Sequence, residues 1–143
     1  MKAFISYKFT GEKQEDLNNL LVPVQNKLKE VGVDAYCNLF DEEFLEISKS
    51  FKQHDFLFHA FKVLDEMKLL FVIINSEEKS EGMILEVGYS LAKGIPVVVA
   101  VKEDIKNTYL PGMANAVIQW SNVSDLISKI GEVDFNGLIS SPE

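Results

Sequence analysis

The chain has 143 residues, of which 47% are hydrophobic and 25% are charged, and its formal net charge is −8. This composition is typical of one globular domain, and the negative charge argues against a nucleic-acid-binding surface. The longest apolar runs, 69–74 and 95–101, are too short to cross a membrane. The single Cys37 cannot form an internal disulfide, so we expect a protein of the reducing cytoplasm.

Short apolar runs alternate with amphipathic segments along the chain, which is the pattern of a parallel sheet covered by helices. We predict strands over residues 3–7, 33–37, 69–75, 95–101 and 117–120. We predict helices over 12–31, 54–67, 81–93 and 123–130, with 38–46 as a loop leading into a helix. Together they predict an α/β fold, a flavodoxin-like or Rossmann-like three-layer sandwich with a five-stranded, mainly parallel sheet.

The expected boundaries are one domain over residues 1–135 and a loosely ordered tail over 136–143. Pro23 lies within the first predicted helix, where it predicts either a kink or a break into two shorter helices. Gly32 and Gly94 suit the ends of two helices, and Ser80 suits the start of the helix over 81–93.

Ligands of open parallel sheets bind beyond the carboxyl ends of the strands. Three predicted loops meet at that edge: residues 7–11, 75–82 and 101–112. Glu86 lies about one turn into the helix that follows the second loop, where the helix dipole favours an ionised carboxylate. Gly82 is four residues earlier, on the same helix face, and lets a ligand approach Glu86 closely.

These residues resemble a known family. The pattern Ser80-x-Gly82-x-x-x-Glu86-x-Gly88, followed by Ala92-x-Gly94-x-Pro96-Val97, is similar to the nucleoside 2-deoxyribosyltransferase superfamily. The resemblance is strongest to the branch that hydrolyses 2′-deoxynucleoside 5′-phosphates. The first strand with its glycine-bearing loop, the Asp55-x-Leu57-Phe58-His59 segment and Trp120 extend the resemblance over residues 2–130.

The resemblance implies an N-glycosidase in which Glu86 attacks the anomeric carbon of the sugar and water then resolves the sugar ester, as in retaining glycosidases. It places Ser80 where the nucleotide-hydrolysing branch has a phosphate-contacting serine. The transferase branch has an aspartate there, which would repel a phosphate. The implied substrate is therefore a (deoxy)nucleoside 5′-monophosphate, and the resemblance implies neither a cofactor nor a metal.

The expected substrate contacts are Phe4, Ser6, Tyr7, Lys8, Gly11, Lys62, Ser80 and Gly82. Three of the family's features are altered. Phe4 occupies the place of a tyrosine whose hydroxyl contacts the nucleophile, and Lys62 the place of an acidic residue that binds and protonates the departing base. A serine that the partner subunit supplies to the phosphate is replaced near Pro111 and Gly112.

Other functions stay open. Base exchange by a deoxyribosyltransferase would use the same nucleophile. The Phe4-Ile5-Ser6-Tyr7 segment also resembles the first strand of TIR domains, some of which cleave NAD with a glutamate, although the Ser-x-x-Cys-x-x-Glu signature is missing. A catalytically decayed domain that binds a nucleotide or a protein is the third possibility, and Lys62 favours it.

We also expect a homodimer. Four phenylalanines between residues 51 and 61 exceed what one core-facing helix stripe needs, and Phe56 and Phe58 should point away from it. The alternative is that these rings pack beneath the segment 38–46.

Overall fold

Five strands form one sheet in the computed structural model, which describes residues 1–140. They are β1 (Lys2–Ser6), β2 (Asp34–Tyr36), β3 (Leu69–Ile74), β4 (Val97–Lys102) and β5 (Ala116–Trp120). Every neighbouring pair is parallel and the order is β2-β1-β3-β4-β5. This is the flavodoxin-like order, so the predicted fold class is confirmed.

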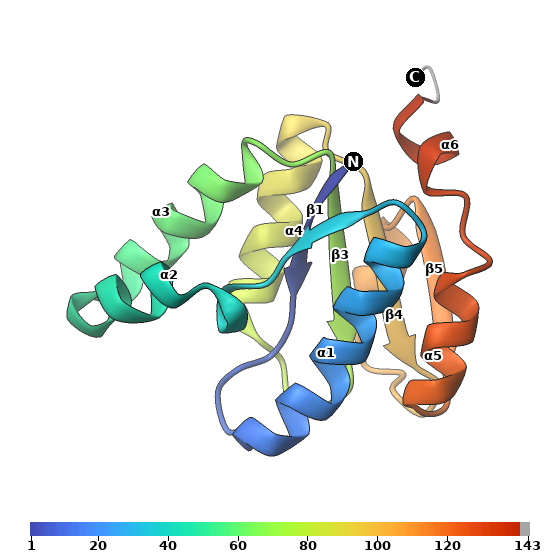
Figure 1. Cartoon of the computed structure of the whole chain (residues 1–143), viewed down its shortest axis with the longest axis horizontal. Coiled ribbons are helices and arrows are strands. Elements are labelled where there is room, and N and C mark those ends of the chain that lie inside the picture. Colours follow the sequence, from blue (N-terminus) through green and yellow to red (C-terminus); the bar gives the residue numbers. More distant parts are fainter. Residues whose placement is uncertain (141–143) are drawn as a thin grey trace.

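Helices cover both faces of the sheet (Figure 1). On one face lie α1 (Gln14–Glu30) and α5 (Val123–Ile130), and on the other lie α3 (Gln53–Leu64) and α4 (Glu81–Lys93). The segment that we expected to be a loop leading into a helix contains the 3-10 turn η1 (Asn38–Phe40) and the short helix α2 (Glu42–Ile47). The other 3-10 turns are η2 (Ser48–Ser50) and η3 (Leu110–Met113).

Strand β3 is buried on both faces and carries the core. Leu69, Phe71 and Ile73 pack in the cluster beneath α1 and α5. Leu70, Val72 and Ile74 point the other way and pack beneath α3 and α4. A strand whose side chains alternate between two covered faces must be apolar throughout, as this sequence is.

The local signals at the helix ends hold. Gly94 ends α4 at a φ of 72°, and Gly32 follows α1 at a φ of 90°, both in the left-handed region that favours glycine. Ser80 caps α4, because its side-chain oxygen accepts a hydrogen bond of 3.2 Å from the Met83 backbone N–H. Helix α1 is continuous through Pro23, since buried leucines and Val24 hold it to the sheet on both sides of that residue.

Where we expected a loosely ordered tail, the structure has the short helix α6 (Phe135–Ser140). Phe135 is buried in the cluster beneath α1 and α5, and Leu138 packs against that cluster. The Asp134 carboxylate accepts a hydrogen bond of 3.1 Å from the Gly137 N–H, within the first turn of this helix. Residues 141–143 of the predicted tail lie outside the described residues.

Within residues 1–140, no helix combines the length and the apolar character that crossing a membrane requires.

Candidate functional site

The site lies where the sheet changes its direction of winding. From β1 the chain crosses to β2 on one side, whereas from β3 it crosses to β4 on the other. The loops that follow β1 and β3 therefore diverge and leave a crevice at the carboxyl ends of these two strands. Ser6 is the last residue of β1, and α4, which carries Glu86, follows β3.

A short hydrogen bond joins the two sides of this crevice. The Ser6 hydroxyl donates to Glu86 Oε1 at 2.6 Å, across 80 residues of sequence. Ser6 is buried, so its hydroxyl is fixed by the sheet rather than by solvent. Of the two carboxylate oxygens of Glu86, Oε1 is thus the one that Ser6 engages.

Burial raises the pKa of Glu86 from its usual 4.5 to about 7, and the hydrogen bond from Ser6 opposes part of that rise. The pKa of Glu86 is thus raised, whereas we expected its position near the start of the helix to favour the ionised form. A carboxylate with a pKa near neutrality, in a crevice at the carboxyl ends of the strands, is typical of a functional group. Glu86 can therefore exist in both protonation states at neutral pH.

A cavity of about 660 Å³ opens at Glu86, and we name it the Glu86 cavity. One part of its wall is aromatic and comes from β1, β2, α2 and α3: Phe4, Tyr36, Phe44, Phe56 and His59. Another part is polar and comes from the loop after β1 and from the start of α4: Lys8, Thr10, Lys79, Ser80 and Gly82. The cavity thus offers flat apolar surfaces together with hydrogen-bond donors and cations.

The aromatic wall is held together by ring contacts and one carboxylate. The Phe44 and His59 rings lie with their centroids 4.8 Å apart, and those of Phe4 and Tyr36 lie 5.7 Å apart. Asp41 accepts hydrogen bonds from the Tyr36 hydroxyl at 2.7 Å and from the Phe44 N–H at 3.1 Å. The bond from Tyr36 is the main reason that the pKa of Asp41 is lowered. This wall suits a planar ring system.

His59 stands out within the aromatic wall. Its Nε2 atom is buried and has no hydrogen-bond partner among the described residues. Its ring also lies 6.0 Å, between centroids, from that of Phe51. Such an atom loses the hydrogen bonds that water would give it, which is a cost that binding sites often carry.

The polar wall surrounds the start of α4. The Ser80 oxygen accepts from Met83, which leaves its own O–H free to donate to a ligand. Lys8 is buried, and its ammonium lies 3.4 Å from both the Glu12 and the Glu78 carboxylates. The ammonium also donates a hydrogen bond to the Thr10 carbonyl oxygen, and the Glu12 side chain is only 22% exposed. Glu78 is 81% exposed, so of the two carboxylates it is the weaker competitor for an incoming anion.

A second cavity of about 270 Å³ adjoins Glu86, and Ser6 and Tyr7 contribute to its lining. The Tyr7 hydroxyl donates to the Asn38 side-chain oxygen at 2.6 Å. Burial is the first cause of the raised pKa of Tyr7, followed by Cys37 and Glu86. Tyr7 is therefore a neutral hydrogen-bonding group beside the carboxylate.

Most residues that we expected to contact a substrate meet at these cavities. Among the predicted site residues, those that line one or both cavities are Phe4, Ser6, Tyr7, Lys8, Ser80, Gly82 and Glu86. Gly11 and Lys62 line neither. Gly11 makes an exposed turn at a φ of 81°, and Lys62 is an exposed residue near the end of α3.

Sequence reasoning missed the wall that β2, α2 and α3 supply. Tyr36 is the last residue of β2 and Asn38 lies just after it, so the same rule that singled out three other loops could have found them. His59 belongs to the Asp55-x-Leu57-Phe58-His59 segment that extends the family resemblance, but we did not predict it as a site residue. The expected third loop, 101–112, does not reach Glu86 and borders a different cavity.

Comparison with solved structures shows the same fold in other proteins. A CMP N-glycosidase of Clostridium botulinum, BcmB, matches with a TM-score of 0.69 and 13% identity, over 92% of this chain and 98% of that one. A conserved protein of Enterococcus faecalis V583 matches with a TM-score of 0.70 and 17% identity, over 92% and 97%.

A 3-dehydroquinate dehydratase-like protein of Bifidobacterium longum matches with a TM-score of 0.55 and 10% identity, over 92% and 94%. No protein-family model and no curated protein matches the chain. At these identities the matches establish the fold, and the first is in line with the resemblance found in the sequence.

Replacing Glu86 with glutamine is expected to stabilise the protein, in a pH-dependent way. The raised pKa means that the folded state binds the extra proton between pH 4.5 and about 7, so stability falls as pH rises through that window. Glutamine keeps an acceptor for Ser6 without a charge. We expect urea unfolding at pH 8 to show a gain of up to about 3 kcal/mol, which vanishes near pH 4.

Glu81→Gln is the matched control, because Glu81 is exposed on the same helix. It should leave the free energy of unfolding nearly unchanged at both pH values. If Glu86→Gln destabilised the protein equally at pH 4 and pH 8, burial of the ionised Glu86 carboxylate would not be the cost that we infer.

Proposed function

We propose that this protein is an N-glycosidase that hydrolyses the bond between base and sugar in a nucleoside 5′-monophosphate. The observation that carries the proposal is the Glu86 carboxylate, held by Ser6 at 2.6 Å on a cavity with an aromatic wall and a polar wall. A planar base suits the first wall and a phosphate suits the second.

The chemistry follows from Oε2, the second oxygen of the Glu86 carboxylate. Oε2 bonds to the anomeric carbon while the bond from that carbon to the base nitrogen breaks, and the electron pair leaves with the base. Water then attacks the sugar ester, gives its proton to the medium, and releases the sugar phosphate and the carboxylate. The Ser6 hydroxyl stabilises the ionised Glu86 before attack and after release.

The departing base must gain a proton, which it takes from the medium and which the attacking water later returns; Lys62, which was expected near the base, does not line the cavity. We assign contact with the base to His59, whose ring lies in the aromatic wall. An imidazole can donate a hydrogen bond to a ring nitrogen or an exocyclic oxygen of the base. It thereby takes the place that an acidic residue has in the family that the sequence resembles.

The phosphate is assigned to the start of α4. The first N–H groups of a helix and the Ser80 hydroxyl form a donor set that suits an oxyanion, and Lys79 and Lys8 add positive charge. The likeness in fold to a protein described as a CMP N-glycosidase supports a nucleotide over a free nucleoside. If a second base replaces water as the acceptor, the same first step gives base exchange.

We further propose a homodimer that forms through α4, in the cytoplasm and without nucleic acid as a partner. Ile84, Leu85 and Leu91 are exposed and lie on one side of this helix around Gly88. A Cβ atom at Gly88 would meet nothing within 4 Å, so a second α4 can approach there closely. The two phenylalanines that were expected to point away from the core are both exposed, Phe56 by 44% and Phe58 by 58%, although Phe56 also packs against Phe44 and Phe51.

The first test is base release from a panel of nucleosides and 5′-monophosphates, followed by chromatography. Glu86→Gln should reduce kcat/KM at least a thousandfold, because it removes the nucleophile. The wild-type kcat/KM should rise with pH to a plateau above about pH 7, as Glu86 ionises.

Ser6→Ala should move that rise upward by about one pH unit, because the hydrogen bond that lowers the Glu86 pKa is lost. Ser6→Thr keeps the hydroxyl and should keep the profile. Base release that Glu86→Gln leaves unchanged would refute the nucleophile. A wild type that binds nucleotides without any turnover would favour a binding domain.

The phosphate assignment predicts a gain of affinity on removing Glu78. Glu78→Gln removes the exposed one of the two carboxylates beside Lys8 and leaves the pair with Glu12 in place, so KM for a 5′-monophosphate should fall severalfold, while KM for the matching nucleoside should not change. Glu15→Gln, on α1, is the control for the altered net charge. An equal change in KM for nucleoside and nucleotide would place the phosphate elsewhere.

The dimer is tested by mass in solution. Light scattering at micromolar concentration should give twice the chain mass for the wild type and the chain mass for Gly88→Glu. Val22→Glu places the same charge on an exposed position of α1 and should remain dimeric. A monomeric wild type would contradict the proposed dimer interface through α4.

A further inference from the structure

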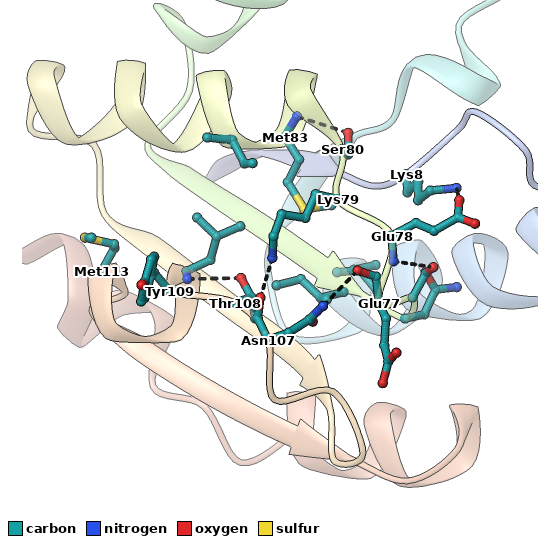
Figure 2. Close-up of a pocket in the computed structure, with 16 residues that line it drawn as sticks. Lys8, Glu77, Glu78, Lys79, Ser80, Met83, Asn107, Thr108, Tyr109 and Met113 are labelled. Atoms are coloured by element: carbon teal, nitrogen blue, oxygen red, sulfur yellow. Dashed lines mark hydrogen bonds and ion pairs between the residues drawn. The ribbon is translucent and has the colours of Figure 1, made fainter.

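A third cavity, of about 240 Å³, lies at the carboxyl ends of β3 and β4, and the proposed hydrolysis does not use it. We name it the Tyr109 cavity. Its floor is apolar and includes Ile73, Met83 and Leu110. The connection after β4, with η3, forms one wall, and the loop between β3 and α4 forms the opposite wall (Figure 2).

Reciprocal hydrogen bonds hold the two walls together. The Lys79 ammonium donates to the Asn107 carbonyl oxygen, and the Asn107 side-chain N–H donates to the Glu77 carbonyl oxygen at 3.2 Å. On the connection itself, the Thr108 hydroxyl oxygen accepts from the Leu110 N–H at 3.2 Å. These bonds, drawn in Figure 2, fix both loops, so the cavity is formed before any ligand arrives.

The Tyr109 cavity and the Glu86 cavity meet at three residues. Lys8, Lys79 and Ser80 line both of them. Two cations and the cap of α4 thus stand between the apolar floor of the Tyr109 cavity and the aromatic wall of the Glu86 cavity, with the exposed Glu77 and Glu78 beside them. A ligand with an anionic centre and a planar apolar group on either side would match this arrangement.

Tyr109 gives the third cavity an aromatic rim. Its side chain is 89% exposed, and Met113 beside it is 50% exposed. Figure 2 shows Tyr109 and Lys8 at opposite ends of the group of lining side chains. An exposed ring above an apolar floor can stack on a planar group that enters the cavity.

We propose that the substrate is a nucleoside 5′-diphosphate ester that carries a second planar group, in the manner of a dinucleotide. The proposal rests on the proposed function, and it extends the substrate beyond the monophosphate. The cleaved nucleoside occupies the Glu86 cavity, the two phosphates lie along Lys8, Lys79 and Ser80, and the second planar group enters the Tyr109 cavity. The exposed Glu78 side chain leaves Lys8 when the phosphates bind.

The test compares three matched sets of compounds for A, C, G and U: the nucleoside 5′-monophosphates, the 5′-diphosphates and the symmetric dinucleoside 5′,5′-diphosphates. The diphosphates separate the effect of the added phosphate from that of the second planar group. We expect kcat/KM for base release from the dinucleoside compound to exceed that from the diphosphate at least tenfold. Equal values would overturn the proposal.

Tyr109→Ala should remove about tenfold of that preference and leave monophosphate cleavage unchanged, while Tyr109→Phe should keep the preference. A loss of activity that is equal for all three sets, together with a fall in mass to that of one chain, would mean that a second copy covers the cavity. That outcome would also overturn the proposal.

Calorimetric binding to the Glu86→Gln variant separates this proposal from the proposed function. If no compound releases base, the proposed hydrolase is refuted. The Tyr109 cavity is still supported as the site of the second planar group if the dinucleoside diphosphate binds more tightly than the diphosphate and Tyr109→Ala weakens that binding. If the monophosphate is cleaved and the dinucleoside compound binds no better than the diphosphate, only the extension fails.

Discussion

The hydrogen bond from Ser6 to Glu86 is the contact on which the rest of the site depends. It ties the last residue of β1 to the second turn of α4, across the point where the sheet reverses its winding. A carboxylate on a helix surface would otherwise sample several rotamers. With Oε1 fixed at 2.6 Å from a buried hydroxyl, Oε2 has one defined direction, which a nucleophile requires.

The burial of the Glu86 carboxylate makes the site costly to keep. Burial raises the Glu86 pKa to about 7, and the single bond from Ser6 does not offset the loss of water. His59 adds a buried nitrogen without a partner among the described residues. Buried atoms without such a partner also occur outside this cavity, at Ser90 Oγ and at Nε1 of Trp120, which belongs to the core cluster beneath α1 and α5. The buried carboxylate is therefore the costly feature that sets this cavity apart, and such a group is typical of a functional site.

Sequence reasoning found the elements that local chemistry specifies and missed what depends on register. The apolar run of β3, the cap at Ser80 and the left-handed Gly94 are local signals, and all three hold. The hydroxyl partner of Glu86 was thought lost with Phe4, but β1 presents Ser6 to the carboxylate instead, two residues further along the same face. Lys62 is exposed and lines neither cavity beside Glu86, because each step along a helix turns the side chain by about 100° and small errors of counting change the face.

The boundary between the two main cavities also answers an objection from net charge. A chain of −8 with Glu77, Glu78 and Glu81 beside Ser80 looks hostile to a phosphate. Yet Glu78 is 81% exposed and well screened, whereas Lys8 is buried and projects into both cavities. A buried cation acts through fewer water molecules than an exposed anion, so Lys8 outweighs Glu78 at the boundary, and the start of α4 and the exposed Lys79 add further positive charge. Local burial, rather than the sum of charges, decides which ions this surface can hold.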